Sequence, residues 1–416
     1  MLSLDAGKTS GQEPTAIYLL ACILFVCIEF MLGNDSSAHA HIQQGRQLLA
    51  RLDEGGARRS SPQMELIRRS LVPIYSRLAL TSLTQGQDPV EIPAGMNLYR
   101  EVPAEFESTD DARACLYSVI DDALRASRKV RPLKYEGMVS DMDDEYIPAA
   151  RREHDVLRSR LKAWNVTFTL YLASRSARGG RQGPSNGEKV MIMYYHVAYT
   201  WMSNSFSRVE TTYDDYMDHF TGVVSLASSM QGATGGGAPH GSGWSSASQG
   251  ASSPGTPGSF ASLSADTDGA SPSIRSSASV HQGGSAFVFH DNVIPPLYYT
   301  ACRCRHPRLR RTALALLKEV ARVNPREALW DARYLVPVVE RVIELEEGGM
   351  VPGLGTQGDH GPLFGVPDEL RVREVLINDK VVIRKDPTGA WITILRKLHG
   401  ADGEWDSQRE WVPIGN

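Results

Sequence analysis

The sequence predicts a mostly α-helical protein: a multi-helix antiparallel bundle, built as an array of helical hairpins, with a long disordered insertion and a small C-terminal antiparallel β-meander. Three observations lead to this fold class. Apolar residues recur with the 3.6-residue period of a helix over most of residues 15–347. One segment of Gly, Ser, Ala and Pro interrupts that period. Beyond residue 371 the pattern changes to the apolar–polar alternation of β-strands.

The same observations divide the 416 residues into consecutive segments. The insertion has too few aliphatic residues to offset the entropy of ordering it. The predicted segments are a flexible N-terminus at 1–14, an α-helical domain at 15–230, a disordered Gly/Ser-rich insertion at 231–285, helices that complete the domain at 286–347, a linker at 348–370 and a β-hairpin tail at 371–416.

Charge and cysteine content exclude some classes of protein. The chain has 44 Lys and Arg against 48 Asp and Glu, a net charge of −4, so it is not built as a nucleic-acid binder over its whole length. Its five cysteines are odd in number and irregular in spacing. That pattern argues against a disulfide framework and indicates a reducing compartment.

The most apolar stretch, Thr15–Leu32, is predicted to be a helix that is apolar on every side, which is typical of a core element or a membrane span. It is at the short end of the roughly 20 residues that a bilayer needs. It carries Glu29, and no basic cluster beside it sets an orientation. We therefore expect a buried core helix and no membrane association. A membrane anchor remains the alternative.

The next stretch, Ala38–Leu52, is predicted to pair with the first helix across the GNDSS turn as an antiparallel hairpin. Its apolar stripe consists of Ile42, Leu48, Leu49 and Leu52. His39 and His41 are two residues apart and point to different faces of a helix. They are interpreted as surface histidines and not as metal ligands.

Five more helices are expected before the insertion. The first covers 61–84 with a kink at Pro73. The second follows Ser108–Asp111, which resembles a capping box. Its predicted buried face is Ala112, Cys115, Leu116, Val119, Ile120 and Leu124. The others are Ile147–Ser174, Lys189–Phe206 and a further helix that Thr211-Thr212 opens and that extends to about Met230.

Lys189–Phe206 is the second strongly apolar helix, and it raises two functional hypotheses. His196 lies beside aromatic residues, and a hydrogen-bonded core or groove histidine is favoured over a catalytic one. A helical enzyme would instead need a polar cleft around His196 or His219. The same helix is a candidate wall of a small-molecule pocket, although an ordinary core helix is the favoured interpretation.

After the insertion, order is expected to resume at Ala286–Phe289. The predicted helices are then Ile294–Ala301, Leu309–Val323 and Glu327–Glu347, the last with a kink at Pro337. The predicted strands of the tail are Val372–Ile377, Lys380–Arg384, Trp391–Arg396 and Glu410–Ile414, with a turn at 386–389.

No motif makes a positive case for catalysis or metal binding. Cys302-x-Cys304-x-His306 lacks the usual C-x₂₋₄-C spacing and a second cysteine pair. The basic run Arg303–Arg311 is expected to form a solvated, partly paired face at a helix start. The G-x-G-x-x-G at 353–358 lacks the flanking strand and helix of a dinucleotide site. The acidic run 141–145 lacks the Gly and final Glu of a calcium loop. We therefore predict no enzyme, and no catalytic, cofactor-binding or metal-binding residue.

Several segments carry a resemblance to one family. LLACILFVCIEFMLGNDSSAHAHIQQGRQLL resembles the opening helices of the regulatory region in fungal zinc-cluster (Zn2Cys6, C6 zinc finger) transcription factors. Further segments that are similar to this family are STDDARACL, ETTYDDYMDHFTGVVSLASSM, IPPLYYTACRCRHPRLRRTALALL, REALWDARYLVPVVERVIELEE and GEWDSQREWVPI. The resemblance spans roughly 15–230 and 287–414. Each segment is degenerate alone, and their order and number make the resemblance specific.

The resemblance implies that the helical domain is a fungal-specific transcription factor regulatory domain, located in the nucleus. It would act in transcription regulation through response to a partner or ligand. Family members carry six N-terminal cysteines that bind two zinc ions and place a helix in the DNA major groove. This sequence has no counterpart of those cysteines. The resemblance therefore assigns neither zinc binding nor recognition of DNA bases to any of its residues. The chain then reads as an incomplete gene model or a member without that module.

The resemblance implies two partners for this chain: a second copy in a homodimer, and transcriptional co-regulators. DNA would be bound only through the missing module. No cofactor is expected in this chain, since zinc is implied only for the missing cluster. Two alternatives remain. One is a stand-alone helical scaffold or transcriptional co-regulator without DNA binding, and the other is a membrane-anchored protein.

Overall fold

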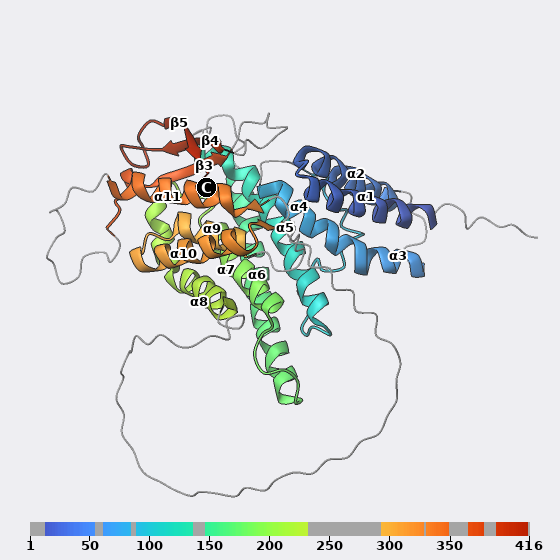
Figure 1. Ribbon diagram of the computed structural model, residues 1–416. Helices are drawn as coiled ribbons and strands as arrows, with labels where there is room; N and C mark the ends of the chain where they lie inside the picture. Colours follow the sequence, from blue (N-terminus) through green and yellow to red (C-terminus); the bar gives the residue numbers. More distant parts are fainter. Residues whose placement is uncertain are drawn as a thin grey trace, which may run out of the picture. The chain divides into compact units, whose positions relative to one another are not determined.

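The computed structural model confirms the predicted fold class: a mostly helical protein of packed helix pairs, with a small C-terminal antiparallel sheet (Figure 1). It describes residues 13–54, 61–84, 89–135, 146–231, 293–327, 330–348, 365–377 and 388–414. Several predictions lie outside these residues: the flexible N-terminus up to residue 12, nearly all of the insertion, the segment Ala286–Phe289, the linker at 349–364, the strand Lys380–Arg384, and the motifs at 141–145 and 353–358.

The first two helices form the predicted antiparallel hairpin. Helix α1 (Glu13–Leu32) packs along α2 (Asp35–Glu54), which begins three residues before the predicted start at Ala38 (Figure 1). Gly33 ends α1 with a φ of 78°, a left-handed conformation that glycine adopts without strain. In the apolar stripe of α2, Ile42 and Leu49 are buried while Leu48 and Leu52 are half-buried, as predicted.

The predicted kink at Pro73 takes the form of a π-helical turn. Helix α3 (Pro62–Leu66) runs into this turn, η1 (Ile67–Leu71), and continues as α4 (Val72–Thr84). Pro73 has no N–H to donate, and its ring conflicts with the carbonyl group one turn earlier, so a wider turn ahead of it relieves both problems. Ser61 caps α3 by accepting a hydrogen bond from the backbone N–H of Met64 at 3.1 Å.

Helices α4, α5 (Thr109–Tyr135), α6 (Tyr146–Ala177) and α7 (Asn186–Ser203) enclose the largest apolar core. The predicted buried face of α5 is confirmed, since none of its six residues is more than 6% exposed. Ser108 caps α5 by accepting from the N–H of Asp111 at 3.1 Å, which is one half of the predicted capping box, and its hydroxyl group donates to the Asp111 carboxylate at 2.7 Å. Helix α7 contributes to this core and to the next one.

The segment opened by Thr211-Thr212 is not one regular helix. It begins as a 3₁₀ turn, η2 (Glu210–Tyr216), and becomes α-helical only in α8 (Met217–Gln231). The start of this turn is capped from the distant tail. The Asp368 carboxylate accepts hydrogen bonds from the N–H groups of Glu210 at 2.6 Å and Thr211 at 3.2 Å, which have no acceptor within the turn.

Beyond the insertion, α8 packs with α9 (Ile294–Arg303), α10 (Pro307–Val323) and α11 (Ala332–Gly348) around a second core. The predicted start of the last helix at Glu327 is wrong. A small antiparallel ribbon, β1 (Arg326–Glu327) with β2 (Trp330–Asp331), precedes α11. The Glu327 side chain is used elsewhere: its carboxylate accepts from the N–H of Ile294 at 2.8 Å and so caps α9.

The C-terminal sheet confirms the predicted meander. A 3₁₀ turn, η3 (Asp368–Leu370), leads into β3 (Val372–Ile377), which pairs with β4 (Gly389–Arg396), which in turn pairs with β5 (Asp406–Pro413). All pairings are antiparallel. The sheet lies beside α11 (Figure 1). The apolar residues on one face of its strands are buried against Val338 and Val342 of this helix.

Candidate functional site

The most exposed apolar surface of the described chain lies on α1, which corrects the prediction of a buried core helix. Only 22% of the window Thr15–Leu32 is buried. Leu19, Cys22, Val26 and Phe30 face α2 and α4, and the opposite side of the helix is open. We define the α1 face as the large apolar residues of this helix that are 47–69% exposed: Ile17, Tyr18, Leu20, Leu24, Phe25, Ile28, Met31 and Leu32.

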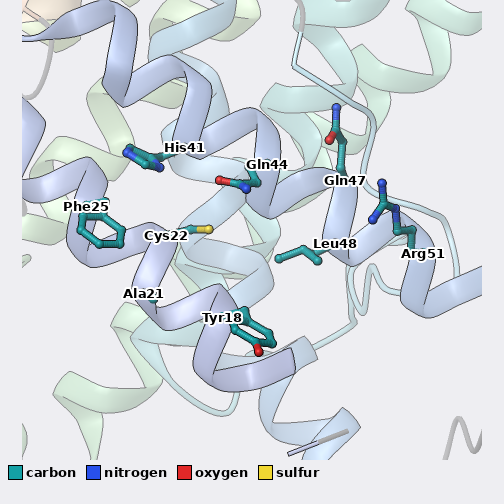
Figure 2. A pocket seen from close by; sticks show the side chains of 9 residues that line it. All are labelled: Tyr18, Ala21, Cys22, Phe25, His41, Gln44, Gln47, Leu48 and Arg51. Carbon is teal, nitrogen blue, oxygen red and sulfur yellow. The ribbon is translucent and has the colours of Figure 1, made fainter. Parts of the chain in front are cut away.

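A groove with a volume of about 370 Å³ runs between α1 and α2 (Figure 2). Tyr18 and Phe25 form its apolar side on α1, and Leu48, Gln44 and Arg51 belong to the α2 side. The predicted surface histidines lie close by. His39 and His41 are both half-buried, and the ring of His41 stacks on Phe25 with centroids 5.1 Å apart. His41 therefore serves packing between the two helices.

The two histidines that sequence reasoning linked to an enzyme do meet. Nδ1 of His196 on α7 lies 3.0 Å from Nδ1 of His219 on α8, so one imidazole donates and the other accepts. Gly222 makes the approach possible, because a Cβ there would lie 2.6 Å from Nε2 of His196. The prediction of a hydrogen-bonded histidine is confirmed, with a partner 23 residues away.

Aromatic rings surround this pair. Tyr199 stacks on His219 with centroids 4.9 Å apart, and Tyr195 and Tyr216 lie near it at 6.0 and 6.1 Å. Burial and the neighbouring His219 lower the pKa of His196 to about 4. At neutral pH the pair is therefore an uncharged, hydrogen-bonded contact between two helices. Among the described residues no three His, Cys, Asp or Glu side chains gather closely enough to hold a metal ion.

The histidine pair makes stability depend on pH. A neutral His196 is favoured in the fold, so the unfolded chain binds a proton first as pH falls below its ordinary pKa of about 6.5. We expect the free energy of unfolding to fall by about 2 kcal/mol between pH 6.5 and 5 from this residue, at about 1.4 kcal/mol per pKa unit. Urea unfolding of the wild type and of His196→Gln at pH 6.5 and pH 5 measures this fall in the free energy of unfolding. The fall in stability should be smaller in the variant by about 2 kcal/mol. The share of His219 and His154, whose pKa values burial also lowers, should remain, and the control His399→Gln, at an exposed histidine, should leave the fall unchanged.

Cys302, Cys304 and His306, which the sequence groups together, have separate structural roles. Cys304 is buried beside Tyr213 and Phe220, and burial raises the pKa of its thiol to about 11. Burial raises the pKa of Cys302 to about 11 as well. Nδ1 of His306 accepts from the N–H of Leu309 at 3.4 Å and caps α10. All five cysteines of the chain are free thiols.

The prediction of a solvated basic face at Arg303–Arg311 is wrong for its central members. Arg305 and Arg310 are 1% and 0% exposed. Both bind Glu346 of α11, through Nη2 of Arg305 at 3.0 Å and Nη2 of Arg310 at 2.5 Å. Arg305 also approaches the carboxylate of Glu210 at 3.5 Å. The predicted solvation applies to Arg311, whose side chain is 53% exposed.

We call this set the arginine–glutamate network; it consists of the half-buried Arg303 and the buried Glu210, Arg305, Arg310 and Glu346. Arg303 binds Glu210 at 2.7 Å. Glu346 also accepts from the N–H of Val372 at 2.8 Å, which ties the first strand of the sheet to α11. Burial would raise the pKa of Glu346, but the charges of Arg305 and Arg310 outweigh burial and leave it below its ordinary value.

Two further arginines join the tail to the helices beside this network. Arg371, 1% exposed, binds Asp214 through two hydrogen bonds of 2.9 and 2.6 Å. Arg373 donates to the carbonyl oxygen of Arg208 at 2.7 Å and pairs with Asp368. The sequence analysis missed these contacts, because nothing local distinguishes an arginine that will be buried from one that faces solvent.

Another buried arginine joins the α1–α2 hairpin to the rest of the helices. Arg46 of α2 is 0% exposed and binds Asp121 of α5 at 3.1 Å. It also donates to the carbonyl oxygens of Tyr75 and Val90. The hydroxyl group of Tyr75 donates to the carbonyl oxygen of Leu19 at 2.7 Å. The hairpin is thus held by specific polar contacts as well as by its apolar side chains.

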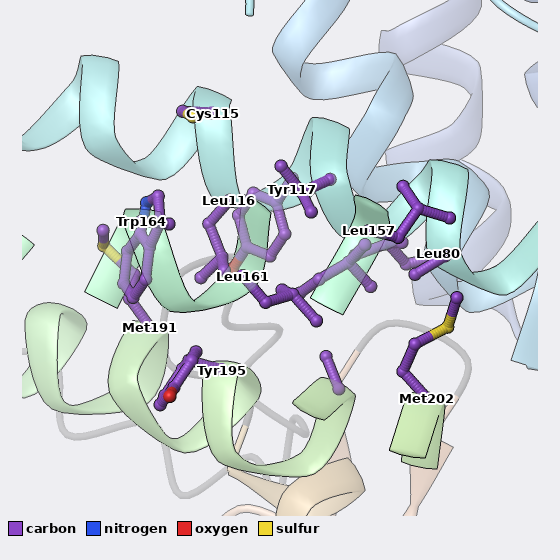
Figure 3. Close-up of a cluster of buried hydrophobic side chains, with 14 of the residues drawn as sticks. Leu80, Cys115, Leu116, Tyr117, Leu157, Leu161, Trp164, Met191, Tyr195 and Met202 are labelled. Atoms are coloured by element: carbon purple, nitrogen blue, oxygen red, sulfur yellow. The ribbon is translucent and has the colours of Figure 1, made fainter. Parts of the chain in front are cut away.

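The hypothesis that α7 lines a small-molecule pocket gains no support from its surroundings. Met191 and Tyr195 of this helix point into the largest core near Trp164 of α6, and Met202 enters the same core further along, near Leu80 (Figure 3). Met193 contributes to the second core. A shallow hollow of about 450 Å³ lies elsewhere, between α6 and the segment around Val102. Helix α7 is therefore a shared core element, as the favoured interpretation held.

No protein-family model, curated protein or solved structure matches this chain.

Proposed function

We propose that this chain is the regulatory region of a fungal-type zinc-cluster transcription factor, which acts in the nucleus by responding to a partner or ligand and not by catalysis. The observation that supports the proposal is a set of buried ion pairs that joins segments of the resemblance far apart in the chain. Glu210, Arg305 and Glu346 come from three different segments of the resemblance, and they bind one another in the arginine–glutamate network.

Such a network suits a regulatory role for a physical reason. Buried ion pairs require a definite geometry, because each charge that loses its partner in the interior is costly. The network and Arg371 together connect η2, the α9–α10 corner, α11 and the start of the sheet. A partner that binds one of these elements would therefore act on the others through contiguous contacts.

A tethering experiment tests the proposal. The full chain is fused to a heterologous DNA-binding domain in a fungal cell that carries a matching reporter gene. We expect reporter transcription to rise or fall relative to the DNA-binding domain alone, and a fluorescent fusion of the chain to accumulate in the nucleus. An unchanged reporter, with the fusion expressed and folded, would contradict the proposal. The matched control is Trp164→Ala, which damages the core and should abolish the effect.

One observation favours a second candidate, a membrane-anchored protein. By length and composition α1 could cross a membrane: its window Thr15–Leu32 has a mean hydropathy of 2.4. A span would require α1 to leave the contacts of Leu19 and Phe30 with the neighbouring helices. Carbonate washing of cell membranes separates the candidates, since an integral protein remains in the pellet and a regulatory protein is released.

A further inference from the structure

The α1 face is too large and too apolar to remain in water. Taking about 200 Å² for a large apolar residue, its exposed fractions amount to roughly 900 Å². Single apolar patches on monomeric proteins rarely exceed about 600 Å². One partner of a stable protein–protein interface contributes about 800 Å². The area of the α1 face is therefore that of one half of a dimer interface.

The order of the residues on this face fits a second copy of the same helix. Ile17, Leu20, Leu24, Ile28 and Met31 follow one another at three- and four-residue steps and form a continuous stripe. If two copies of α1 lie antiparallel across a two-fold axis at Leu24, then Ile17 faces Met31 and Leu20 faces Ile28, each in both directions. An isologous interface requires this reciprocity.

Charge favours the same occupant over a lipid surface. The only charged residues in α1 are Glu13 and Glu29, close to its two ends, and its last turn has no basic residue. Interfacial helices usually add Lys or Arg for anionic lipid head groups. A partner helix whose exposed stripe is apolar needs no such complement, and the stripe Ile17–Met31 on the α1 face contains no charged residue.

We infer that the α1 face is a homodimer interface, in which the α1–α2 hairpins of two copies pack antiparallel about a two-fold axis near Leu24 as a four-helix bundle. The stripe on α1 then occupies the centre, and each α2 stays on the outer side through the contacts of Ile42 and Leu49. This inference goes beyond the proposed function and does not rest on it.

The mass of the full chain in solution is the first test. At micromolar concentration, light scattering should give twice the 45.7 kDa of one chain. Leu24→Glu places two carboxylates against each other at the axis and should give the monomer mass with an unchanged circular dichroism spectrum, because Leu24 is 64% exposed in the single chain. Val166→Glu, at a 58% exposed residue of α6, is the matched control and should leave the dimer intact.

Cysteine cross-linking tests the orientation. Mixing Ile17→Cys with Met31→Cys under mild oxidation should give a covalent dimer, whereas Ile17→Cys alone should not exceed the wild-type background from Cys22 and Cys27. A monomeric wild type, or a dimer that Leu24→Glu leaves unchanged, would overturn the inference. So would a monomer that co-sediments with phosphatidylcholine vesicles through Leu24, since the face would then serve lipid. The reporter result is independent: a dimer without a reporter effect contradicts only the proposed function.

Discussion

Replacing Glu346 with alanine is expected to lower the free energy of unfolding by about 3–5 kcal/mol, the usual cost of removing one partner from a buried ion pair. The substitution leaves Arg305 and Arg310 without their shared carboxylate in a region where both are at most 1% exposed. It also removes the acceptor for the N–H of Val372. The sheet should therefore loosen from α11, and hydrogen exchange at Val372 should accelerate.

Urea unfolding and hydrogen exchange measure the two effects. The neighbouring Glu347 is the matched control, because its close partner is Arg311, whose side chain is 53% exposed, and it reaches the buried Arg310 only at 4.0 Å. Exposed ion pairs contribute about 0–1 kcal/mol, so Glu347→Ala should cost no more than that. Equal costs for the two substitutions would show that the arginine–glutamate network is not a cooperative buried unit. Since the pKa of Glu346 is lowered, its contribution should be complete at neutral pH and lost only as acid protonates it.

Replacing Trp164 with alanine is expected to lower the free energy of unfolding by a similar amount, about 3–5 kcal/mol. Trp164 is 0% exposed in the largest core (Figure 3). Its ring stacks on Phe168 with centroids 4.8 Å apart, and its Nε1 donates to the carbonyl oxygen of Ala112 at 2.7 Å. The substitution opens a cavity and removes a buried hydrogen bond between α6 and α5.

Denaturant unfolding with two companion variants separates these causes. Trp164→Phe keeps most of the apolar volume but leaves the Ala112 carbonyl group without its donor, so its cost should lie between those of the wild type and Trp164→Ala. Val166→Ala, at a 58% exposed residue of the same helix, should change stability by at most about 0.5 kcal/mol. If Trp164→Ala costs no more than Val166→Ala, the packing described around α6 is wrong.

The sequence predicted the elements that depend on local periodicity. The buried face of α5, from Ala112 to Leu124, follows from apolar residues at helical spacing, and the strands of the tail follow from their alternation. The α1–α2 hairpin was also predictable, because two adjacent helices joined by a short turn pack antiparallel. Each of these patterns is complete within some 20 or 30 residues.

Predictions failed where a contact joined distant segments. The expected helix start at Glu327 is wrong, because this side chain caps α9 instead, and the cap of η2 comes from Asp368, 158 residues away from Glu210. The basic run was expected in solvent because its carboxylate partners, Glu210 and Glu346, lie 95 and 36 residues from the arginines that they bind. No local pattern indicates which arginine will find such a partner.

By itself the sequence determined that this protein is helical, where most of its helices lie, and that a small antiparallel sheet ends it. Only the tertiary structure decided which charged residues are buried, that His196 meets His219, and that α1 exposes half of an all-round apolar surface. The physical reason is that periodicity reports which side of an element avoids water, whereas the choice of partner is made by the packing of elements that are far apart in the chain. On α1, where every side is apolar, periodicity carries no direction, and only the neighbours decide which side stays open.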